Sequence, residues 1–182
     1  NTMNRRTVSL ALAVLLTLAV ALPVWAQGPA AFNVEEMLKL KRVSDPQLSP
    51  DGMKIAFVVT DVSLDANTRN NDIWVVPAAG GAPVKMVGTD RSEDRARWSP
   101  DGKQVAFVSN REGGPQVWVI PAAGGEPKRL TTTATGASGV TWSPDGKWIA
   151  FVSDVFPACA DAACNERELK ARDESKVKAH LA

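Results

Sequence analysis

The chain has 182 residues, enough for about one domain, and its 21 Lys and Arg nearly balance its 20 Asp and Glu. This mixed, near-neutral charge gives no indication of binding to nucleic acid or to an anionic surface. One His and two Cys leave little material for a His/Cys metal site, so neither a metal nor a cofactor is expected. Six Trp without any Tyr suggest aromatic positions reused in a repeat.

The first residues have the pattern of a secretory signal. Arg5 and Arg6 precede an almost wholly apolar stretch at residues 8–22, and Ala26 ends a small-residue cleavage pattern. Cleavage after Ala26 would make residues 1–26 a signal peptide and place the mature protein in the periplasm or outside the cell. An uncleaved anchor is the alternative, because the apolar stretch approaches the length of a membrane span. We expect the membrane to matter for export only.

Residues 27–42 are predicted to form a linker and a short helix. Asn33 stands three residues before Glu36, which is a capping-box arrangement at a helix start. Glu35 and Glu36 could act as a carboxylate pair that binds an amine or serves catalysis. Acidic residues in a first helical turn are also favoured by the helix dipole, and this structural role is the one we expect.

The phrase Ser-Pro-Asp-Gly occurs three times, at residues 49–52, 99–102 and 143–146, and each copy leads into a strand-like apolar segment. Pro presets φ, Asp can bond to its own backbone, and Gly accepts a left-handed conformation, so each copy predicts a tight hairpin turn. The residues expected to build these structural turns are Pro50, Asp51, Gly52, Pro100, Asp101, Gly102, Pro144, Asp145 and Gly146.

Aromatic residues recur in register with these turns. Trp74 and Trp118 are 44 residues apart, and so are Phe107 and Phe151. A period in the forties, built from short strands and tight turns, is typical of β-propeller blades. The sequence therefore predicts an all-β fold: a partial β-propeller at residues 43–164, with two full four-stranded, WD-repeat-like blades and the start of a third. The short N-terminal helix and a charged C-terminal helix flank it.

The repeat also separates two sets of connections. The Ser-Pro-Asp-Gly turns and the Ala-Ala-Gly-Gly turns are predicted to share one end of the blades, while longer and more variable loops share the other. The first blade carries six extra residues, all within residues 61–71, and insertions usually fall in loops. Because binding residues favour such loops, the long-loop end is the expected working face.

Cys159 and Cys164 lie in the last of these loops. In an exported protein a local disulfide is the natural interpretation, and closing so short a loop would contribute about 2 kcal/mol in the entropic model. Free thiols and a metal site are the alternatives, although metal-ligand pairs are usually spaced more closely.

A charged helix is predicted at residues 165–182, with Asn165 as its cap, inside an insertion of the third blade that the chain covers only in part. His180 is the one candidate general base, and it has no partner in view. Ser138 follows Gly136, but Val140 occupies the position where a hydrolase elbow needs Gly. No catalytic residue is therefore assigned.

Two segments resemble the propeller of the prolyl oligopeptidase family of serine peptidases, in particular its bacterial exported dipeptidyl and acylaminoacyl peptidases. One is the lead-in helix with Val-Ser-Asp-Pro-Gln-Leu-Ser-Pro-Asp-Gly at residues 43–52. The other is Ser-Asp-Val-Phe-Pro at residues 153–157 with the two Cys and Asn165. The resemblance covers residues 32–182. The Ser-Pro-Asp-Gly-Lys turns alone are shared with other propellers, including that of the Tol envelope system.

The resemblance implies that the chain is the N-terminal propeller portion of an exported serine peptidase. In that family the propeller gates the access of peptide substrates to a Ser-Asp-His triad in a later α/β-hydrolase domain. None of the triad motifs is present in this sequence, so this portion alone is expected to be inactive and its parent to be longer. A non-catalytic periplasmic binding propeller of the Tol-like type is the alternative. The oligomeric state stays open.

Overall fold

The computed structural model describes residues 33–175, and the compact unit begins at Val34. The predicted signal peptide lies outside the described residues, and so does the end of the charged segment with His180. None of the helices in the described part of the chain is long and apolar enough to cross a membrane.

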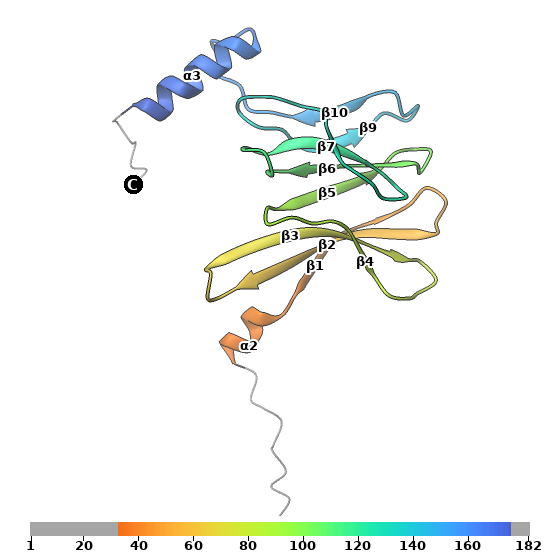
Figure 1. The fold of residues 1–182 in the computed structure, drawn as a ribbon. Coiled ribbons are helices and arrows are strands. Elements are labelled where there is room, and N and C mark those ends of the chain that lie inside the picture. Colours follow the sequence, from red (N-terminus) through yellow and green to blue (C-terminus); the bar gives the residue numbers. More distant parts are fainter. Residues whose placement is uncertain (1–32, 176–182) are drawn as a thin grey trace, which may run out of the picture. The chain divides into compact units, whose positions relative to one another are not determined.

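Two four-stranded antiparallel sheets and one two-stranded sheet follow one another along the chain (Figure 1). The first contains β1 (Arg42–Leu48), β2 (Lys54–Ser63), β3 (Thr68–Pro77) and β4 (Val84–Val87). The second contains β5 (Glu93–Trp98), β6 (Gln104–Ser109), β7 (Gln116–Pro121) and β8 (Lys128–Arg129). The third contains β9 (Ser138–Trp142) and β10 (Ile149–Val152). In each sheet neighbouring strands are consecutive in sequence, as in propeller blades.

The strand register repeats from blade to blade, as the recurring Phe and Trp residues of the sequence predict. Phe57 pairs with Trp74 in the first blade, and Phe107 pairs with Trp118 in the second. Each aromatic pair stands on the same face of its sheet, because directly opposed residues in an antiparallel pair project to one side. The partial propeller with two full blades and the opening strands of a third is confirmed.

The core lies between blades. The face of the first blade that carries Ala56 and Ile73 packs against the face of the second that carries Phe107 and Trp118. The next interface repeats this arrangement, with Ala106 and Val117 of the second blade in one cluster with Val140 of the third, against which Trp142 packs. Each interface therefore joins a small-residue face to a bulky face of the following blade.

The six extra residues of the first blade do not form a loop. They lengthen β2 and β3, which stay paired from Lys54 opposite Pro77 out to Ser63 opposite Thr68. The loop prediction for residues 61–71 was wrong except at the short turn between these strands. Thr, Val and Asn in the extra segment continue the antiparallel ladder, so the hairpin projects as paired strands.

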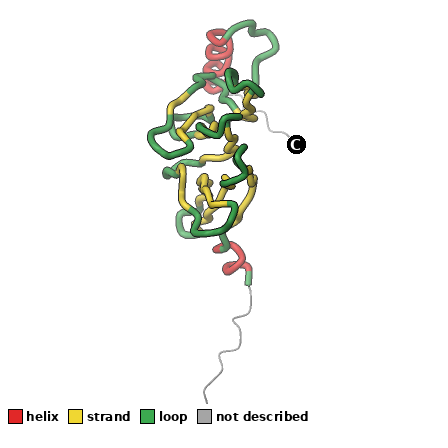
Figure 2. The backbone as a smooth tube through the Cα atoms, turned by 90° about the vertical axis from the view of Figure 1, so that its right-hand side faces the viewer, coloured by secondary structure: helices red, strands yellow, loops and turns green. Residues whose placement is uncertain are grey.

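The two helices flank the strands, as Figure 2 shows. Helix α2 (Val34–Lys39) is where the capping pattern predicts it, and Glu36 lies 2.8 Å from the ammonium of Lys39. Helix α3 (Ala162–Glu174) begins three residues earlier than predicted. Asp161 caps it by accepting a hydrogen bond from the backbone N–H of Cys164 at 2.7 Å, so the assignment of the cap to Asn165 was wrong.

Candidate functional site

The three tight turns are built by one set of bonds. In the first copy the Ser49 hydroxyl donates to the Asp51 carboxylate at 2.6 Å, and the Met53 N–H donates to the same carboxylate at 3.0 Å. Gly52 has a φ of 71° and its N–H donates to the Ser49 carbonyl. The serine hydroxyl, followed by the backbone N–H, holds the pKa of the carboxyl below its usual value in all three copies: Asp51, Asp101 and Asp145.

These turns are structural. In each copy the Oδ1 atom of the Asp carboxylate accepts both bonds inside the turn, and the turns of successive blades lie in contact. A Cβ placed on Gly102 would meet Pro50 of the preceding blade at 3.8 Å, and one on Gly146 would meet Pro100 at 3.6 Å. The predicted turn residues thus order one end of the blades, and their carboxylates are committed to the turns themselves.

Each innermost strand carries a bulge that the sequence analysis missed. The register of β1 and β5 shifts opposite Phe57 and Phe107, where Asp45 (φ 49°) and Arg95 (φ 56°) adopt left-handed backbone. Gly139 (φ 62°) occupies the aligned position in β9. Bulges redirect side chains and concentrate near functional sites. The glycine in the third copy is the one sequence signal that could have revealed them, since it marks a position that needs positive φ.

The bulges bring charged side chains of adjacent blades together. Arg97 of β5 donates to Asp45 of β1 at 2.9 Å. The Oδ1 atom of Asp94 is buried without a hydrogen-bond partner, and the nearest recorded cation is Arg95, at 3.9 Å. Burial raises the pKa of Asp94, and the nearby Asp45 carboxylate raises it further, against the opposing effect of the two arginines.

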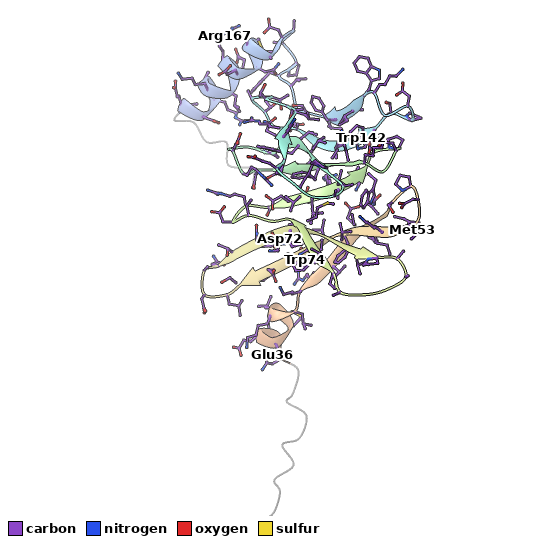
Figure 3. All side chains as sticks on the ribbon, turned by 45° about the vertical axis from the view of Figure 1, so that its right-hand side comes forward. Glu36, Met53, Asp72, Trp74, Trp142 and Arg167 are labelled. Carbon is purple, nitrogen blue, oxygen red and sulfur yellow. A yellow bond between two sulfur atoms is a disulfide. The ribbon has the colours of Figure 1, made fainter. Side chains whose placement is uncertain are left out.

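Indole hydrogen bonds link the innermost strands of successive blades. The Nε1–H of Trp98 donates to the Gln47 carbonyl at 3.0 Å, and that of Trp142 donates to the Arg97 carbonyl at the same distance. Trp142 is labelled in Figure 3. Leu48 occupies the aligned position in the first blade and is 61% exposed. Trp98 and Trp142 therefore each join two neighbouring blades, one at each of the two interfaces described.

The long-loop end of the second blade contains a buried ionic network. Glu93 is fully buried and accepts hydrogen bonds from the Thr89 and Ser109 hydroxyls and from Arg111 at 3.1 Å. The Arg111 guanidinium also lies 4.9 Å from the centre of the Trp118 ring. Because the carboxylate has several donors and the cation is stacked on an aromatic face, the network holds this loop in place.

The two cysteines form a disulfide that closes the segment after β10. Asn165 lies inside α3, is buried, and accepts a hydrogen bond from the Phe156 N–H at 2.8 Å. The segment is attached to the third blade, where the Ser153 hydroxyl donates to the Gly136 carbonyl at 2.6 Å. A cavity of about 290 Å³ lies between the disulfide, the start of α3 and the loop before β9.

No catalytic set is assembled in the part of the chain that the structure describes. Ser138 is the first residue of β9, not the tip of a strand–turn–helix elbow. Glu35 and Glu36 lie in the exposed first turn of α2. Among residues 33–175 no group of three or more His, Cys, Asp and Glu side chains is placed to hold a metal ion.

Four-stranded antiparallel blades joined at their inner strands define the chain as part of a β-propeller. Residues 66–159, more than half of the chain, match the family model of the Tricorn protease N-terminal beta propeller domain, and the chain belongs to that family.

Curated relatives of the chain are peptidases. It is 34% identical over 81 residues to the uncharacterized peptidase YuxL of Bacillus subtilis, a match that covers 44% of this chain. It is 31% identical over 83 residues to dipeptidyl-peptidase 5 of Porphyromonas gingivalis, covering 46% of this chain. The matches span 12% of each relative's length. The chain thus corresponds to a small part of these enzymes.

Solved structures show the same fold. The acylaminoacyl peptidase of Pyrococcus horikoshii superposes with a TM-score of 0.56 at 22% identity, over 72% of this chain and 21% of that chain. A putative TolB from Agrobacterium tumefaciens superposes with a TM-score of 0.50 at 26% identity, over 65% of this chain and 41% of that one.

Proposed function

We propose that this chain is the N-terminal propeller portion of an exported serine peptidase. In this proposal the propeller restricts the access of peptides to a Ser-Asp-His triad in a separate α/β-hydrolase domain. The observation that carries it is the match to the Tricorn protease propeller family together with curated peptidase relatives that match this region.

The inner-strand charges give this filter a physical basis. Blades radiate from a central channel, so innermost strands such as β1 and β5 line it. Their bulges place Asp94 and the half-exposed Arg95 at this position. A channel with fixed charges of both signs and low-dielectric walls discriminates among passing peptides by their charge.

Export is part of the proposal, and the Cys159–Cys164 disulfide supports it, because disulfides persist in oxidising compartments such as the periplasm. Sequencing of the mature N-terminus tests it directly: cleavage after Ala26 would yield a protein beginning at Gln27, whereas an intact N-terminus in the membrane fraction would support an anchor.

The enzymatic half of the proposal is tested on the native, full-length exported protein with a fluorophosphonate probe, which labels activated serines. Labelling that is lost on mutation of a single serine in the partner domain supports a serine peptidase. A folded but unlabelled protein refutes it. That outcome would favour the second candidate, a binding propeller, for which the likeness to TolB is the specific observation. The next measurement would then be a pull-down of binding partners, with the long-loop end of the blades as the expected contact surface.

The filter is tested separately with Arg95→Glu in the same full-length enzyme. Reversing this charge should raise kcat/KM for basic peptides relative to acidic ones, and added salt should reduce the change. Lys128→Glu makes the same charge change on the outer strand β8 and serves as the matched control. Equal selectivity in both variants and in the unmodified enzyme would refute a charge filter at the inner strands.

A further inference from the structure

Each of the three Ser-Pro-Asp-Gly turns contains an Asp–Gly pair, a sequence whose peptide bond rearranges readily. The pairs are residues 51–52, 101–102 and 145–146. Glycine has no Cβ to hinder its backbone nitrogen, and this nitrogen can attack the carboxyl carbon of the preceding Asp side chain. All three Asp residues are exposed, so water, the only other reactant, reaches them freely.

The rearrangement proceeds in two steps. In the first, a bond forms between the glycine nitrogen and the Asp carboxyl carbon, and the proton of that nitrogen leaves with the carboxyl hydroxyl as water. In the second, one water adds to the main-chain carbonyl of the resulting succinimide ring and breaks its bond to the nitrogen. The backbone then runs through the side-chain carboxyl carbon as isoaspartate, one methylene longer. The reaction therefore needs a protonated carboxyl group and a glycine N–H that is free to lose its proton.

In the second turn, two hydrogen bonds keep the Asp101 carboxyl group ionised. The Ser99 hydroxyl donates to its Oδ1 atom at 2.6 Å, and the Lys103 N–H donates to the same atom at 3.0 Å. The serine bond is the largest cause that holds the pKa of Asp101 below its usual value, and the charge of Lys103 acts in the same direction. An ionised carboxylate has no hydroxyl to lose, so the first step is disfavoured.

The glycine nitrogen of this turn is occupied as well. The Gly102 N–H donates to the Ser99 carbonyl at 2.8 Å, and attack on the carboxyl carbon has to break this bond first. Gly102 also lies against the preceding blade, where Pro50 is 3.8 Å from the position of an added Cβ. The N–H groups of Gly52 and Gly146 make the same bond in their turns, at 2.9 Å in each. The structure therefore opposes both requirements of the reaction.

The serine hydroxyl is itself anchored to the hairpin. Ser99 is buried, and its hydroxyl accepts a hydrogen bond from the Gln104 N–H at 2.9 Å. The backbone of the turn is set by other residues, because Pro presets φ and Gly accepts a left-handed conformation. Ser49 and Ser143 nevertheless make the same 2.6 Å bond to the carboxylates of their own turns. The repeated bond therefore acts on the carboxylate more than on the shape of the turn.

We propose that the serine of each Ser-Pro-Asp-Gly turn is a protecting residue, whose hydrogen bond to the Asp carboxylate suppresses rearrangement of the Asp–Gly bond to isoaspartate. The three turns are thus modification sites that the native structure keeps closed. A methylene added at residue 101 would displace Gly102 from the Ser99 carbonyl and from Pro50, and so loosen the contact between the first two blades. This inference does not depend on the proposed peptidase function.

The test follows isoaspartate in the 182-residue chain during storage at neutral pH. Trypsin releases the three turns in separate peptides, residues 43–54, 98–103 and 130–147, and electron-transfer fragmentation in a mass spectrometer distinguishes isoaspartate from Asp. Ser99→Ala should raise the rate at residue 101 at least about tenfold, because it removes a hydrogen bond to a charged group. The other two turns should keep their rates and serve as internal controls in the same molecule.

Two further variants separate protection from loosening of the turn. Ser99→Thr keeps a hydroxyl and should restore most of the protection. Pro100→Ala loosens the turn but keeps the serine bond, so it should raise the rate at residue 101 much less than Ser99→Ala does. Circular dichroism checks that each variant is folded, and Ser49→Ala repeats the test at residue 51 if Ser99→Ala does not fold.

Unfolding supplies the last control. In urea the bonds of the turn are absent, so Ser99→Ala should have no effect there. The proposal is overturned if a folded Ser99→Ala chain forms isoaspartate at residue 101 no faster than the unmodified chain. It is also overturned if Pro100→Ala has an equal effect, if Ser99→Thr gives no rescue, or if the effect of Ser99→Ala is equally large in urea. Acceleration at all three turns of a folded chain would refute it too, since general loosening would then be the cause.

Discussion

The repeat offers a matched test of what the outer neighbouring strand of a blade contributes to stability, because β6 is paired with β7 whereas β10 has no outer neighbour within residues 33–175. Phe107 and Phe151 occupy the same column of consecutive blades, yet Phe107 is 0% exposed and Phe151 is 41% exposed. Phe107 lies in the core cluster between the first two blades, opposite Trp118 and with the Arg111 guanidinium 5.6 Å from its ring centre. Phe107→Ala therefore leaves a closed cavity, whereas Phe151→Ala removes a ring that is already in contact with water.

The expected costs differ by severalfold. Truncating a fully buried Phe costs about 3–5 kcal/mol, which includes the cavity left behind. The partly exposed Phe151 loses only part of the burial energy and leaves no cavity, so we expect about 1 kcal/mol. Urea unfolding followed by circular dichroism measures both, and the larger loss should lower the midpoint of the Phe107→Ala variant by about 1–2 M.

Phe57→Ala is the control, because Phe57 stands in the same column of the first blade and is half-buried. Its cost should fall between the other two. Equal losses of unfolding free energy at Phe107 and Phe151 would refute the argument, since they would mean that the opposing strand with its Trp contributes nothing to the packing of this Phe position.

Three further predictions concern single interactions. Trp142→Phe removes the indole bond to the Arg97 carbonyl and should cost about 1 kcal/mol in urea unfolding. Cys164→Ala opens the disulfide and should destabilise the segment after β10 by about 2 kcal/mol, seen as faster proteolysis there. Asp94→Asn should raise the thermal midpoint at pH 7. Burial raises the pKa of Asp94, so its ionised form is disfavoured in the folded state, and the gain should vanish below about pH 4, where the carboxyl is protonated in both states.

Each of these has a result that would contradict it. An unchanged unfolding free energy in Trp142→Phe would show that the inter-blade bond is replaced by water without loss. Cleavage within the blades, at the same rate as in the segment after β10, would show that the disulfide does not act locally in Cys164→Ala. A gain from Asp94→Asn that persists at pH 3 would assign the effect to something other than the carboxyl charge.

The blades could be predicted from the sequence because their determinants are local and repeated. The Pro, Asp and Gly that favour a tight turn stand at adjacent positions. The Phe–Trp pairs follow once the two strands that carry them within a blade are taken to have equal length. The structure reproduces both, with Phe57 opposite Trp74 and Phe107 opposite Trp118. The repetition was decisive, because a single copy of the turn motif does not distinguish a propeller blade from an isolated β-hairpin.

The inner-strand bulges could not be predicted in the same way. Positive φ is usually marked by glycine, but here Asp45 and Arg95 adopt it in the first two blades. Asp has some local preference for positive φ, but Arg has none, and in both strands the conformation coincides with the register shift of the bulge. The Asp45–Arg97 pair between the first two blades depends on these bulges, so the charged part of the candidate site was also hidden from the sequence.

The start of α3 was misplaced for a related reason. Asn165 followed by Glu168 satisfies the local rule for a helix cap as well as Asp161 does, and nothing in the sequence separates them. In the structure Asn165 is needed elsewhere, because its amide accepts from the Phe156 N–H and donates to the Asp161 carbonyl at 2.7 Å. A tertiary role therefore decided between two equally good local patterns.

At both contacts between neighbouring blades, a hydrogen bond from an indole joins the inner strands, and this bears on function. At each contact an indole N–H reaches the innermost strand of the preceding blade, which ties neighbouring inner strands together where the bulges carry their charges. Leu48 cannot donate such a bond, so within residues 33–175 the inner strand of the first blade is tied in this way only by Trp98 of the second. Asp45 accepts hydrogen bonds from Gln47 of its own blade at 3.0 Å and from Arg97 of the next blade at 2.9 Å, and the Arg97 carbonyl in turn accepts from Trp142 of the third blade. The geometry of the Asp45–Arg97 pair should therefore depend on Trp142 as well as on Trp98.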